Sequence, residues 1–512
     1  MRATILLALW AGAISFVAAQ SVSVVTTSGT LLGVQDNGVR IFRGVRFGQA
    51  PVRWAAPVAF QSTATLNATT FGATCVQQFP QGSDLVQQLF NNPSNPPVES
   101  EDCLFLNVWA PQTAQSLPVV IWIYGGSLAF GSASVPMYDG AILARNQSVI
   151  VVSVHYRTNV FGFPASPDLA VTNNNFGFMD QELAMTWVQN NIAKFGGDPK
   201  KVTIMGESAG SLSVSIAIAR HAPGTAPFRA GIMFSGAQGT LRSPTFDSFN
   251  AFATAVGCTQ SPGTARLACL RQVTTQRIRS YTNSAASGTF RPLVDNVTVV
   301  TDPLLRLRNR QTANVPFLIG NMQDDGTLFT IGQTNLAAYL QTTFGGVVTA
   351  AQVRPLYPGL NDTQIIWAVA RDFTFLCPSH LWASAAVGAG ISNVFRYSYG
   401  AVWADLQKFP NAGAWHSSEL FSVFGTYNRS TATAAEATLS STIQTAIANF
   451  IKDPTVAPAP NWPKYLAGSS TNTLAKLAYS GNVLTSNVVQ AVGSTSLDGP
   501  CSLWDQFLDV RA

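Results

Sequence analysis

The stretch VTIMGESAGSLSVSIAIAR, Val202 to Arg220, decides the fold. Residues that favour strands run up to Met205 and into Gly-Glu-Ser-Ala-Gly, and a helix-like segment follows from Ala209. This order predicts a strand, a sharp turn and a helix, with Ser208 exposed in the turn as a nucleophile. The G-x-S-x-G pattern alone is weak, because it also arises by chance. The strand and helix around it favour a nucleophile over an ordinary serine in a glycine-rich turn.

Short apolar runs bounded by turn residues recur along the chain: LPVVIWIYGG, SVIVVSVHYR, KVTIMGES, RAGIMFSGA and VPFLIGNMQDDG. Helix-like stretches lie between several of them, as from Gln181 to Phe195, where apolar residues share one face. Apolar strands that alternate with helices predict an α/β fold whose mostly parallel sheet is covered on both faces. Sites in such sheets form at the carboxyl ends of the strands. Each of these runs ends in a turn rich in Gly, Ser, Asp or Asn.

A serine hydroxyl needs a base that takes its proton, and the chain holds 4 histidines. His416 is the candidate, because it lies on a late loop and gives the order Ser…acid…His of an α/β hydrolase. His380 ranks second. His155 closes an apolar run and is expected to pack at a strand end. His221 follows the predicted helix, which places it roughly 20 Å from Ser208 at the wrong end.

The acid is expected between Ser208 and His416, where no glutamate occurs. Asp324 and Asp325 directly follow an apolar run and its turn, which is the position of a site residue. Asp295 also follows an apolar stretch, a shorter one (PLVD), and competes with them; for Asp295 a purely structural role is the alternative interpretation. The remaining aspartates of this region are Asp247, Asp302, Asp362, Asp372 and Asp405. The acid would orient the imidazole and stabilise its charged form without taking the proton.

Donors for the developing oxyanion are expected after the apolar run from Pro118 to Tyr124, which ends in Gly-Gly-Ser. Backbone N–H groups at this strand end, upstream of the elbow, are where such hydrolases take one donor, and Ala209 would supply another. Each donor typically contributes ~3–4 kcal/mol to catalysis. A simple glycine turn is the alternative.

The composition and the first residues predict an exported globular protein. The chain is 47% hydrophobic and 11% charged, which indicates a large buried core. Its net charge of +5 comes from scattered Lys and Arg, so nucleic-acid binding is not expected. Residues 1–19 combine a positive start, an apolar run and small residues, which predicts a secretory signal peptide. No later apolar run approaches the ~18 residues that span a bilayer.

The cysteines and the sequons agree with an oxidising, extracellular destination. The cysteines are Cys75, Cys103, Cys258, Cys269, Cys377 and Cys501. They lack CxxC or CxxH spacing, so no zinc site is expected, and the sequence alone does not pair them. Glycosylation is expected in surface loops at the asparagines of five sequons: Asn67, Asn146, Asn296, Asn361 and Asn428.

The chain resembles the type-B carboxylesterases, a family that includes cholinesterases and the large fungal lipases. The blocks that carry the resemblance are FRGVRFGQAP (42–51), SEDCLFLNVWAP (100–111), NFGFMDQELAMTWVQNNIAKFGGDP (175–199) and GESAGS (206–211). PLVDN, GNMQDDGT, the His416 segment and NWPKY continue the family order over nearly the whole mature chain. The resemblance implies one α/β-hydrolase domain over residues 20–512 that needs no metal and no organic cofactor.

The resemblance implies the triad Ser208, Asp325 and His416. The family acid precedes the glycine of its block, which selects Asp325 and keeps Asp324 as the alternative. That acid is usually glutamate. Aspartate is one methylene shorter, so its loop must lie closer to His416.

The resemblance also implies the oxyanion donors Gly126, Ser127 and Ala209. Ser127 stands where the family has the third glycine of a Gly-Gly-Gly run, and its side chain can crowd the site or hydrogen-bond within it. Glu207 and Glu419 match family glutamates, and Glu207 is expected to support the histidine through hydrogen bonds.

The family pattern implies the disulfides Cys75–Cys103, Cys258–Cys269 and Cys377–Cys501. The first closes the loop Val76 to Asp102, which forms a mobile lid in fungal lipases; a packed surface loop is the alternative. This loop has no tryptophan, so it lacks the aromatic face on which cholinesterases hold a quaternary ammonium group. Ala286 and Gly288 stand where cholinesterases keep bulky phenylalanines, which implies a roomy acyl side.

These features together predict a secreted serine carboxylesterase that cleaves a small-molecule or lipid ester through an acyl-enzyme. A true lipase, in contact with an oil–water interface, is the runner-up. A non-catalytic binding protein of the same fold is a third hypothesis, which the presence of all three triad residue types disfavours.

Overall fold

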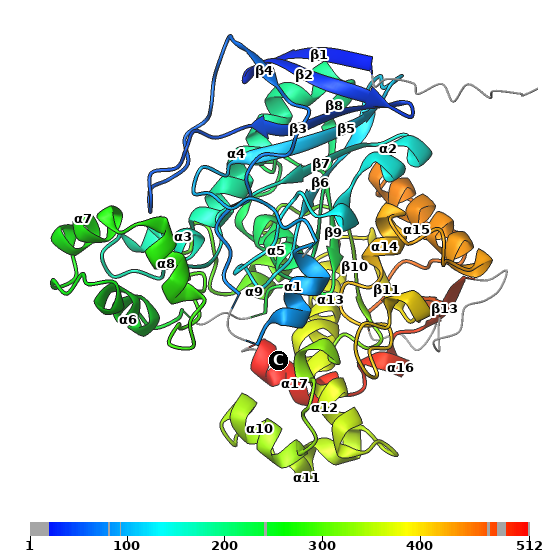
Figure 1. The fold of residues 1–512 in the computed structure, drawn as a ribbon. Coiled ribbons are helices and arrows are strands. Elements are labelled where there is room, and N and C mark those ends of the chain that lie inside the picture. Colours follow the sequence, from blue (N-terminus) through cyan, green and yellow to red (C-terminus); the bar gives the residue numbers. More distant parts are fainter. Residues whose placement is uncertain are drawn as a thin grey trace, which may run out of the picture.

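The computed structural model describes residues 20–79, 82–92, 94–239, 243–467, 472–478 and 488–509. The predicted signal peptide, residues 1–19, lies outside the described residues. One large twisted sheet crosses the molecule, and helices cover both of its faces (Figure 1). The α/β expectation is therefore confirmed.

Within the described residues the sheet has 13 strands, in the order β1-β2-β3-β5-β7-β6-β8-β9-β10-β11-β12-β13 with β4 beside β2. Their bounds are β1 (Gln20–Thr26), β2 (Gly29–Asp36), β3 (Val39–Arg46), β4 (Thr65–Asn67), β5 (Phe105–Pro111), β6 (Leu117–Ile123), β7 (Ile150–Val154), β8 (Gly197–Glu207), β9 (Ala230–Phe234), β10 (Phe317–Met322), β11 (Val394–Tyr399), β12 (Asn472–Leu477) and β13 (Val489–Gly493). The strands from β7 to β12 pair in parallel, and both ends of the sheet pair antiparallel.

The apolar runs of the sequence form the parallel centre. Every residue of β7, β9 and β10 is buried, because helices cover both faces there. The antiparallel strands β1 and β2 alternate between more and less buried positions instead, and β3 mixes buried with half-buried residues; the sequence patterns did not identify these three strands.

Two groups of helices sandwich the sheet (Figure 1). One face carries α2 (Ala141–Gln147), α14 (Leu420–Phe424) and α15 (Ala434–Lys452), and the other carries α4 (Phe176–Asn191), α5 (Ala209–Arg220), α9 (Pro303–Arg308) and α13 (Cys377–Gly388). The remaining helices are α1 (Asp84–Phe90), α3 (Asn159–Gly162), α6 (Asp247–Ala255), α7 (Thr264–Gln272), α8 (Thr275–Thr282), α10 (Leu336–Phe344), α11 (Ala350–Val353), α12 (Asp362–Arg371), α16 (Thr495–Asp498) and α17 (Cys501–Leu508). The helix expected from Gln181 to Phe195 is α4 with the 3₁₀ turn η3 (Ile192–Phe195).

Three disulfides tie loops and termini to this core, with the pairing that the family resemblance implies. They are Cys75–Cys103, Cys258–Cys269 and Cys377–Cys501. The last joins α17 to α13 and so fastens the C-terminal segment. No helix in the described part of the chain is both long and apolar enough to cross a membrane.

The asparagines of all five sequons are exposed. The expectation that all of them lie in loops is wrong for two. Asn67 ends strand β4, and Asn146 lies in α2, because exposed positions also occur on edge strands and on the outer faces of helices.

Candidate active site

Ser208 stands between β8 and α5, in the turn that the sequence predicts. Its backbone has φ 56° and ψ −122°, a conformation that costs a non-glycine residue of order 1–3 kcal/mol. Its N–H donates to the carbonyl oxygen of Phe234 at 2.9 Å, which fastens the turn to β9. This strained turn holds the serine at the carboxyl end of the central strand.

Two glycines make the turn possible. A Cβ on Gly206 would lie 2.3 Å from the carbonyl carbon of Gly210. A Cβ on Gly210 would lie 1.9 Å from the carbonyl oxygen of Ile123 in β6. Both positions therefore require glycine, and the G-x-S-x-G pattern has a steric cause here.

His416 lies on the loop before α14, and Asp325 lies just after β10. The Nδ1 atom of His416 is 2.7 Å from Oδ1 of Asp325. The other carboxylate oxygen of Asp325 accepts from the Ser235 hydroxyl at 2.9 Å and from the Met322 N–H at 2.7 Å. Asp325 is fully buried, and these two donors and the imidazole satisfy its carboxyl oxygens.

Asp324, the alternative acid, faces a different partner. Its Oδ2 accepts from the Ala414 N–H at 2.8 Å, and its own N–H donates to the Ala414 carbonyl at 3.1 Å. Asp324 and Trp415 thereby form a parallel β-bridge. The bridge draws the loop of Asp325 against the loop of His416, which is what an aspartate in place of glutamate requires.

The second ring nitrogen of His416 lies beside a carboxyl group. Its Nε2 is buried and makes no hydrogen bond within the described residues, although it lies 3.1 Å from Oε1 of Glu207. That oxygen accepts from the Ser417 hydroxyl at 2.6 Å. Ser208 and His416 line the same cavity, so Nε2 and the serine hydroxyl belong to one site.

The electrostatics of this site favour a proton on the histidine. Burial opposes the charged imidazole, but the Glu207 and Asp325 carboxylates outweigh burial and raise the pKa of His416 above its ordinary value. Burial also raises the pKa of Glu207, against the opposing effects of His416 and Ser417. The arrangement therefore stabilises an imidazolium, the form that a general base reaches after it takes a proton.

Glu419 is buried near these carboxylates. Neither of its carboxyl oxygens has a hydrogen-bond partner within the described part of the chain. Burial, together with Glu207 and Asp325, raises the pKa of Glu419 well above its ordinary value. We therefore expect Glu419 to be neutral, so that it adds no further negative charge beside the histidine.

The loop after β6 brings backbone N–H groups to the nucleophile. The N–H groups of Gly126, Ser127 and Ala209 donate to no group of the described chain. A Cβ on Gly125 would lie 2.9 Å from Cβ of Ser208, so the loop passes directly against the serine. Ser127 has φ 57°, a left-handed conformation that costs roughly 1–2 kcal/mol outside glycine but leaves its N–H in place.

Two cavities meet at Ser208. The first, called the His416 cavity, has a volume of about 210 Å³ and is lined by Val86, Phe90, Gly125, Gly126, Ser127, Phe130, Gly131, Tyr138, Glu207, Ser208, Leu328, Phe329, His416 and Ser417. The second, called the Arg291 cavity, has a volume of about 410 Å³ and is lined by Ser127, Leu128, Ser208, Ala209, Leu212, Ser235, Gly236, Ala237, Arg291, Pro292, Phe329, Thr374 and Phe375. Phe329 belongs to both, and its ring centroid lies 4.9 Å from that of His416.

The residues expected to make the acyl side roomy do not line either cavity. Ala286 is exposed, and a Cβ on Gly288 would lie 2.4 Å from the hydroxyl oxygen of Ser248 in α6. The small size of Gly288 therefore serves helix packing. In the predicted lid, Val86 and Phe90 of α1 do line the His416 cavity, while no residue of α1 is fully buried.

The other histidines lie outside both cavities. His155 is buried against the Ser132 hydroxyl at 3.2 Å, and burial lowers its pKa to about 3. His221 ends α5 beside Glu182, and burial, then Arg220, lowers its pKa to about 4. His380 lies in α13, beside Asp498.

Sequence reasoning missed four residues of the site: Ser235, Phe329, Phe375 and Ser417. Ser235 directly follows β9, so the strand-end rule that selected the aspartates would have found it. The rings of Phe329 and Phe375 pack on His416 with centroids 4.9 and 4.6 Å away, which depends on loop packing that no local pattern shows.

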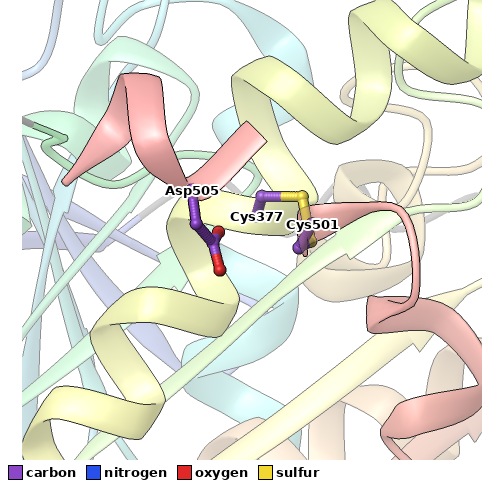
Figure 2. Close-up of side chains that lie close together, drawn as sticks. All are labelled: Cys377, Cys501 and Asp505. Atoms are coloured by element: carbon purple, nitrogen blue, oxygen red, sulfur yellow. A yellow bond between two sulfur atoms is a disulfide. The ribbon is translucent and has the colours of Figure 1, made fainter. Parts of the chain in front are cut away.

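One cluster within the described residues has the geometry to hold a metal ion: Cys377, Cys501 and Asp505. Figure 2 shows the two cysteines joined sulfur to sulfur beside the carboxylate. Disulfide sulfurs are not thiolates, so this cluster does not offer the donor set of a zinc site.

Comparison with known proteins agrees with the geometry. A sequence profile of the carboxylesterase family matches residues 20–351 and 361–492. The para-nitrobenzyl esterase of Bacillus subtilis is 33% identical over 86% of this chain and 92% of its own, and secreted lipase 1 of Botryotinia fuckeliana is 30% identical over 88% of both. A solved structure of a PNB esterase superposes with a TM-score of 0.73 at 29% identity, over 95% of this chain and 99% of that chain.

Proposed function

The chain belongs to the carboxylesterase family and is a carboxylic-ester hydrolase, and we propose that it works through an acyl-enzyme on Ser208. The observation that carries the proposal is that His416, whose Nδ1 lies 2.7 Å from Asp325, lines the same cavity as the strained Ser208. Acyl transfer by a serine needs a nucleophile, a base beside it and an acid that orients the base, and Ser208, His416 and Asp325 would fill these three roles.

In the first half-reaction, the Ser208 oxygen attacks the ester carbonyl while Nε2 of His416 takes the hydroxyl proton. Asp325 holds Nδ1–H and so fixes the tautomer in which Nε2 accepts. The tetrahedral oxyanion is held by the N–H groups of Gly126, Ser127 and Ala209. His416 then protonates the leaving alcohol, and the acyl group stays on Ser208. Water, activated by His416, releases the acid in the second half.

We assign one cavity to each half of the ester. The leaving alcohol must lie near Nε2 of His416, which gives it its proton, and only the His416 cavity is lined by that residue. The acyl chain then occupies the Arg291 cavity, which is lined by Ala209 on the oxyanion side and is the larger of the two.

We also propose export of one domain, residues 20–512, after removal of residues 1–19. Three disulfides support an oxidising compartment, and the similarity to a secreted lipase agrees with it. A single sheet from β1 to β13 supports one domain. We propose that the five exposed sequon asparagines carry glycans where the host glycosylates.

A lipase that acts on oil droplets is the second candidate. The observation in its favour is α1, whose Leu85, Val86, Leu89 and Phe90 are all apolar and half-buried at the His416 cavity or beside it. An element of this kind can exchange its contacts for a lipid surface.

The test is hydrolysis of p-nitrophenyl esters from acetate to palmitate and of emulsified triglyceride, with Ser208→Ala beside the wild type. Ser441→Ala, at an exposed position of α15, is the matched control. We expect the control to keep full activity and Ser208→Ala to lose about 10⁶-fold in kcat. Preference for emulsion over soluble ester would select the lipase. A Ser208→Ala variant that retains activity would remove the proposed nucleophile.

A further inference from the structure

The two cavities at Ser208 differ in charge. The His416 cavity is lined by no lysine or arginine and contains the carboxyl group of Glu207. The Arg291 cavity is lined by no aspartate or glutamate and contains one guanidinium, that of Arg291. An anionic group at the far end of a substrate therefore meets an arginine only in the second of these two cavities.

Arg291 has no partner of its own. Within the described part of the chain it makes no hydrogen bond and no ion pair. Two buried arginines of the chain are paired instead: Arg157 with Asp180 at 2.8 Å, and Arg266 with Asp168 at 2.9 Å. The charge of Arg291 is thus available to a molecule in the cavity.

The position of Arg291 suits the far end of an acyl chain. The residue is exposed at the cavity, whereas Ser127, Ser208 and Ala209 mark the reacting end of the same cavity. Leu212 and Ala237 lie among the lining residues and offer apolar contacts to a methylene chain. Thr374, also exposed, adds a hydroxyl that donates to an anion.

We propose that the enzyme prefers esters whose acyl chain ends in a carboxylate, the monoesters of dicarboxylic acids, and that Arg291 is the residue that selects them. This proposal rests on the proposed function, because it assumes acylation of Ser208. A guanidinium binds a carboxylate through two parallel N–H donors. Arg291 would therefore favour an acyl chain that ends in a carboxylate over one that ends in a neutral group. We expect the alcohol half of the substrate to be neutral, because the other cavity contains the carboxyl group of Glu207 and is lined by no lysine or arginine.

The experiment compares two p-nitrophenyl esters of adipic acid, one with a free carboxylate at the far end and one with that end as the primary amide. The two acyl chains have the same length and shape and differ in charge. In the wild type we expect the higher kcat/KM for the carboxylate. In Arg291→Gln we expect the ratio of carboxylate to amide to fall about fivefold, since an exposed ion pair contributes up to about 1 kcal/mol.

Four controls separate the outcomes. Arg310→Gln removes an equal charge at an exposed residue that lines neither cavity, and should leave the ratio unchanged. Arg291→Lys should keep part of the preference, and added salt should reduce it in the wild type but not in Arg291→Gln. Rates with Ser208→Ala give the background to subtract.

An unchanged ratio in Arg291→Gln, or a wild type that favours the amide, overturns the inference while the esterase stands. A fall as large in Arg310→Gln also overturns it, because the effect would then come from net charge. Failure of the wild type to cleave either ester above Ser208→Ala would instead contradict the proposed function.

Discussion

Two histidines of this chain each lie against an aspartate, and a hydroxyl group lies near each of them. In the site, Asp325 approaches Nδ1 of His416 at 2.7 Å, and Ser208 lines the same cavity. At the C-terminal end, Asp498 approaches Nδ1 of His380 at 3.1 Å, and the Tyr465 hydroxyl lies 3.4 Å from the same nitrogen. Sequence order alone had left His380 as the second choice for the base.

The two networks differ in what neutralises the aspartate. Arg396 contacts both oxygens of Asp498, at 2.6 and 2.9 Å, and holds the pKa of that carboxyl well below its usual range despite burial. In the described part of the chain, the partners of the Asp325 carboxylate are a hydroxyl, a backbone N–H and the imidazole. Among these partners of Asp325 the imidazole of His416 is the one that can carry a positive charge, whereas Asp498 forms an ion pair with Arg396. We therefore expect the Asp325–His416 contact to serve catalysis, because an acid in this position orients the imidazole and stabilises its charged form.

The largest expected effect separates the two histidines by activity. His416→Ala should lower kcat/KM for p-nitrophenyl butyrate about ten-thousandfold or more, because the serine loses its base. His380→Ala should leave kcat per folded molecule unchanged, because His380 lines neither cavity. Circular dichroism of both variants controls for folding. Equal losses in the two variants would show that the comparison is false.

The next effect separates the two neighbouring aspartates. Asp325→Asn should lower kcat about a thousandfold to ten-thousandfold, because the amide favours the wrong imidazole tautomer. Asp324→Asn should lower kcat less than about tenfold, because it loosens the β-bridge to Trp415 but leaves the tautomer intact. Steady-state kinetics at pH 8 measure both. A larger loss in Asp324→Asn than in Asp325→Asn would identify Asp324, the alternative in the sequence analysis, as the acid of the triad.

The elbow was predictable because its constraints are local. Gly206 and Gly210 are fixed by contacts within one strand, turn and helix, so their spacing carries the information. The strand-end rule also placed Asp324 and Asp325, and the family block chose between them. The β-bridge that makes an aspartate sufficient joins residues about ninety positions apart in the chain, and no local pattern encodes it.

The walls of the cavities were not predictable for the same reason. Arg291 comes from a loop, Phe329 from a 3₁₀ helix (Leu328–Thr330) and Phe375 from a π-helix (Asp372–Leu376), and each position depends on how these separate segments pack. The expectation that Gly288 widens the acyl side was wrong, because this glycine packs against Ser248, where a side chain would not fit. At the N-terminus, β1 and β2 alternate in burial over a short stretch, a weaker signal than the continuous apolar runs of the parallel strands.

A third prediction concerns stability at the C-terminal network. Asp498→Asn leaves the buried Arg396 without its counterion, and should destabilise the fold by about 3 kcal/mol. For a chain of this size the shift in Tm is about 3 °C. Asp36→Asn, at an exposed strand end, is the matched control and should not shift Tm. Activity of the folded Asp498→Asn enzyme should be unchanged; a Tm equal to the control would mean that the ion pair adds nothing.

The smallest effect lies in the same network and depends on pH. Asp505, beside the Cys377–Cys501 disulfide (Figure 2), has its pKa raised to about 6 by burial, against the opposing effect of His380. A carboxyl whose folded pKa is raised stabilises the fold below its unfolded pKa of about 4, and that stability is lost as pH rises through about 6. Above pH 6 its ionised form is therefore a penalty.

Asp505→Asn should remove this penalty. We expect the variant to gain stability over the wild type at pH 8, by about 1 kcal/mol after screening by solvent, and to match it at pH 4. Unfolding midpoints at the two pH values measure the difference. A gain at both pH values would assign the effect to packing instead. A gain at pH 8 alone would mean that the ionised Asp505 carboxylate destabilises the C-terminal network, where Arg396 already pairs with Asp498.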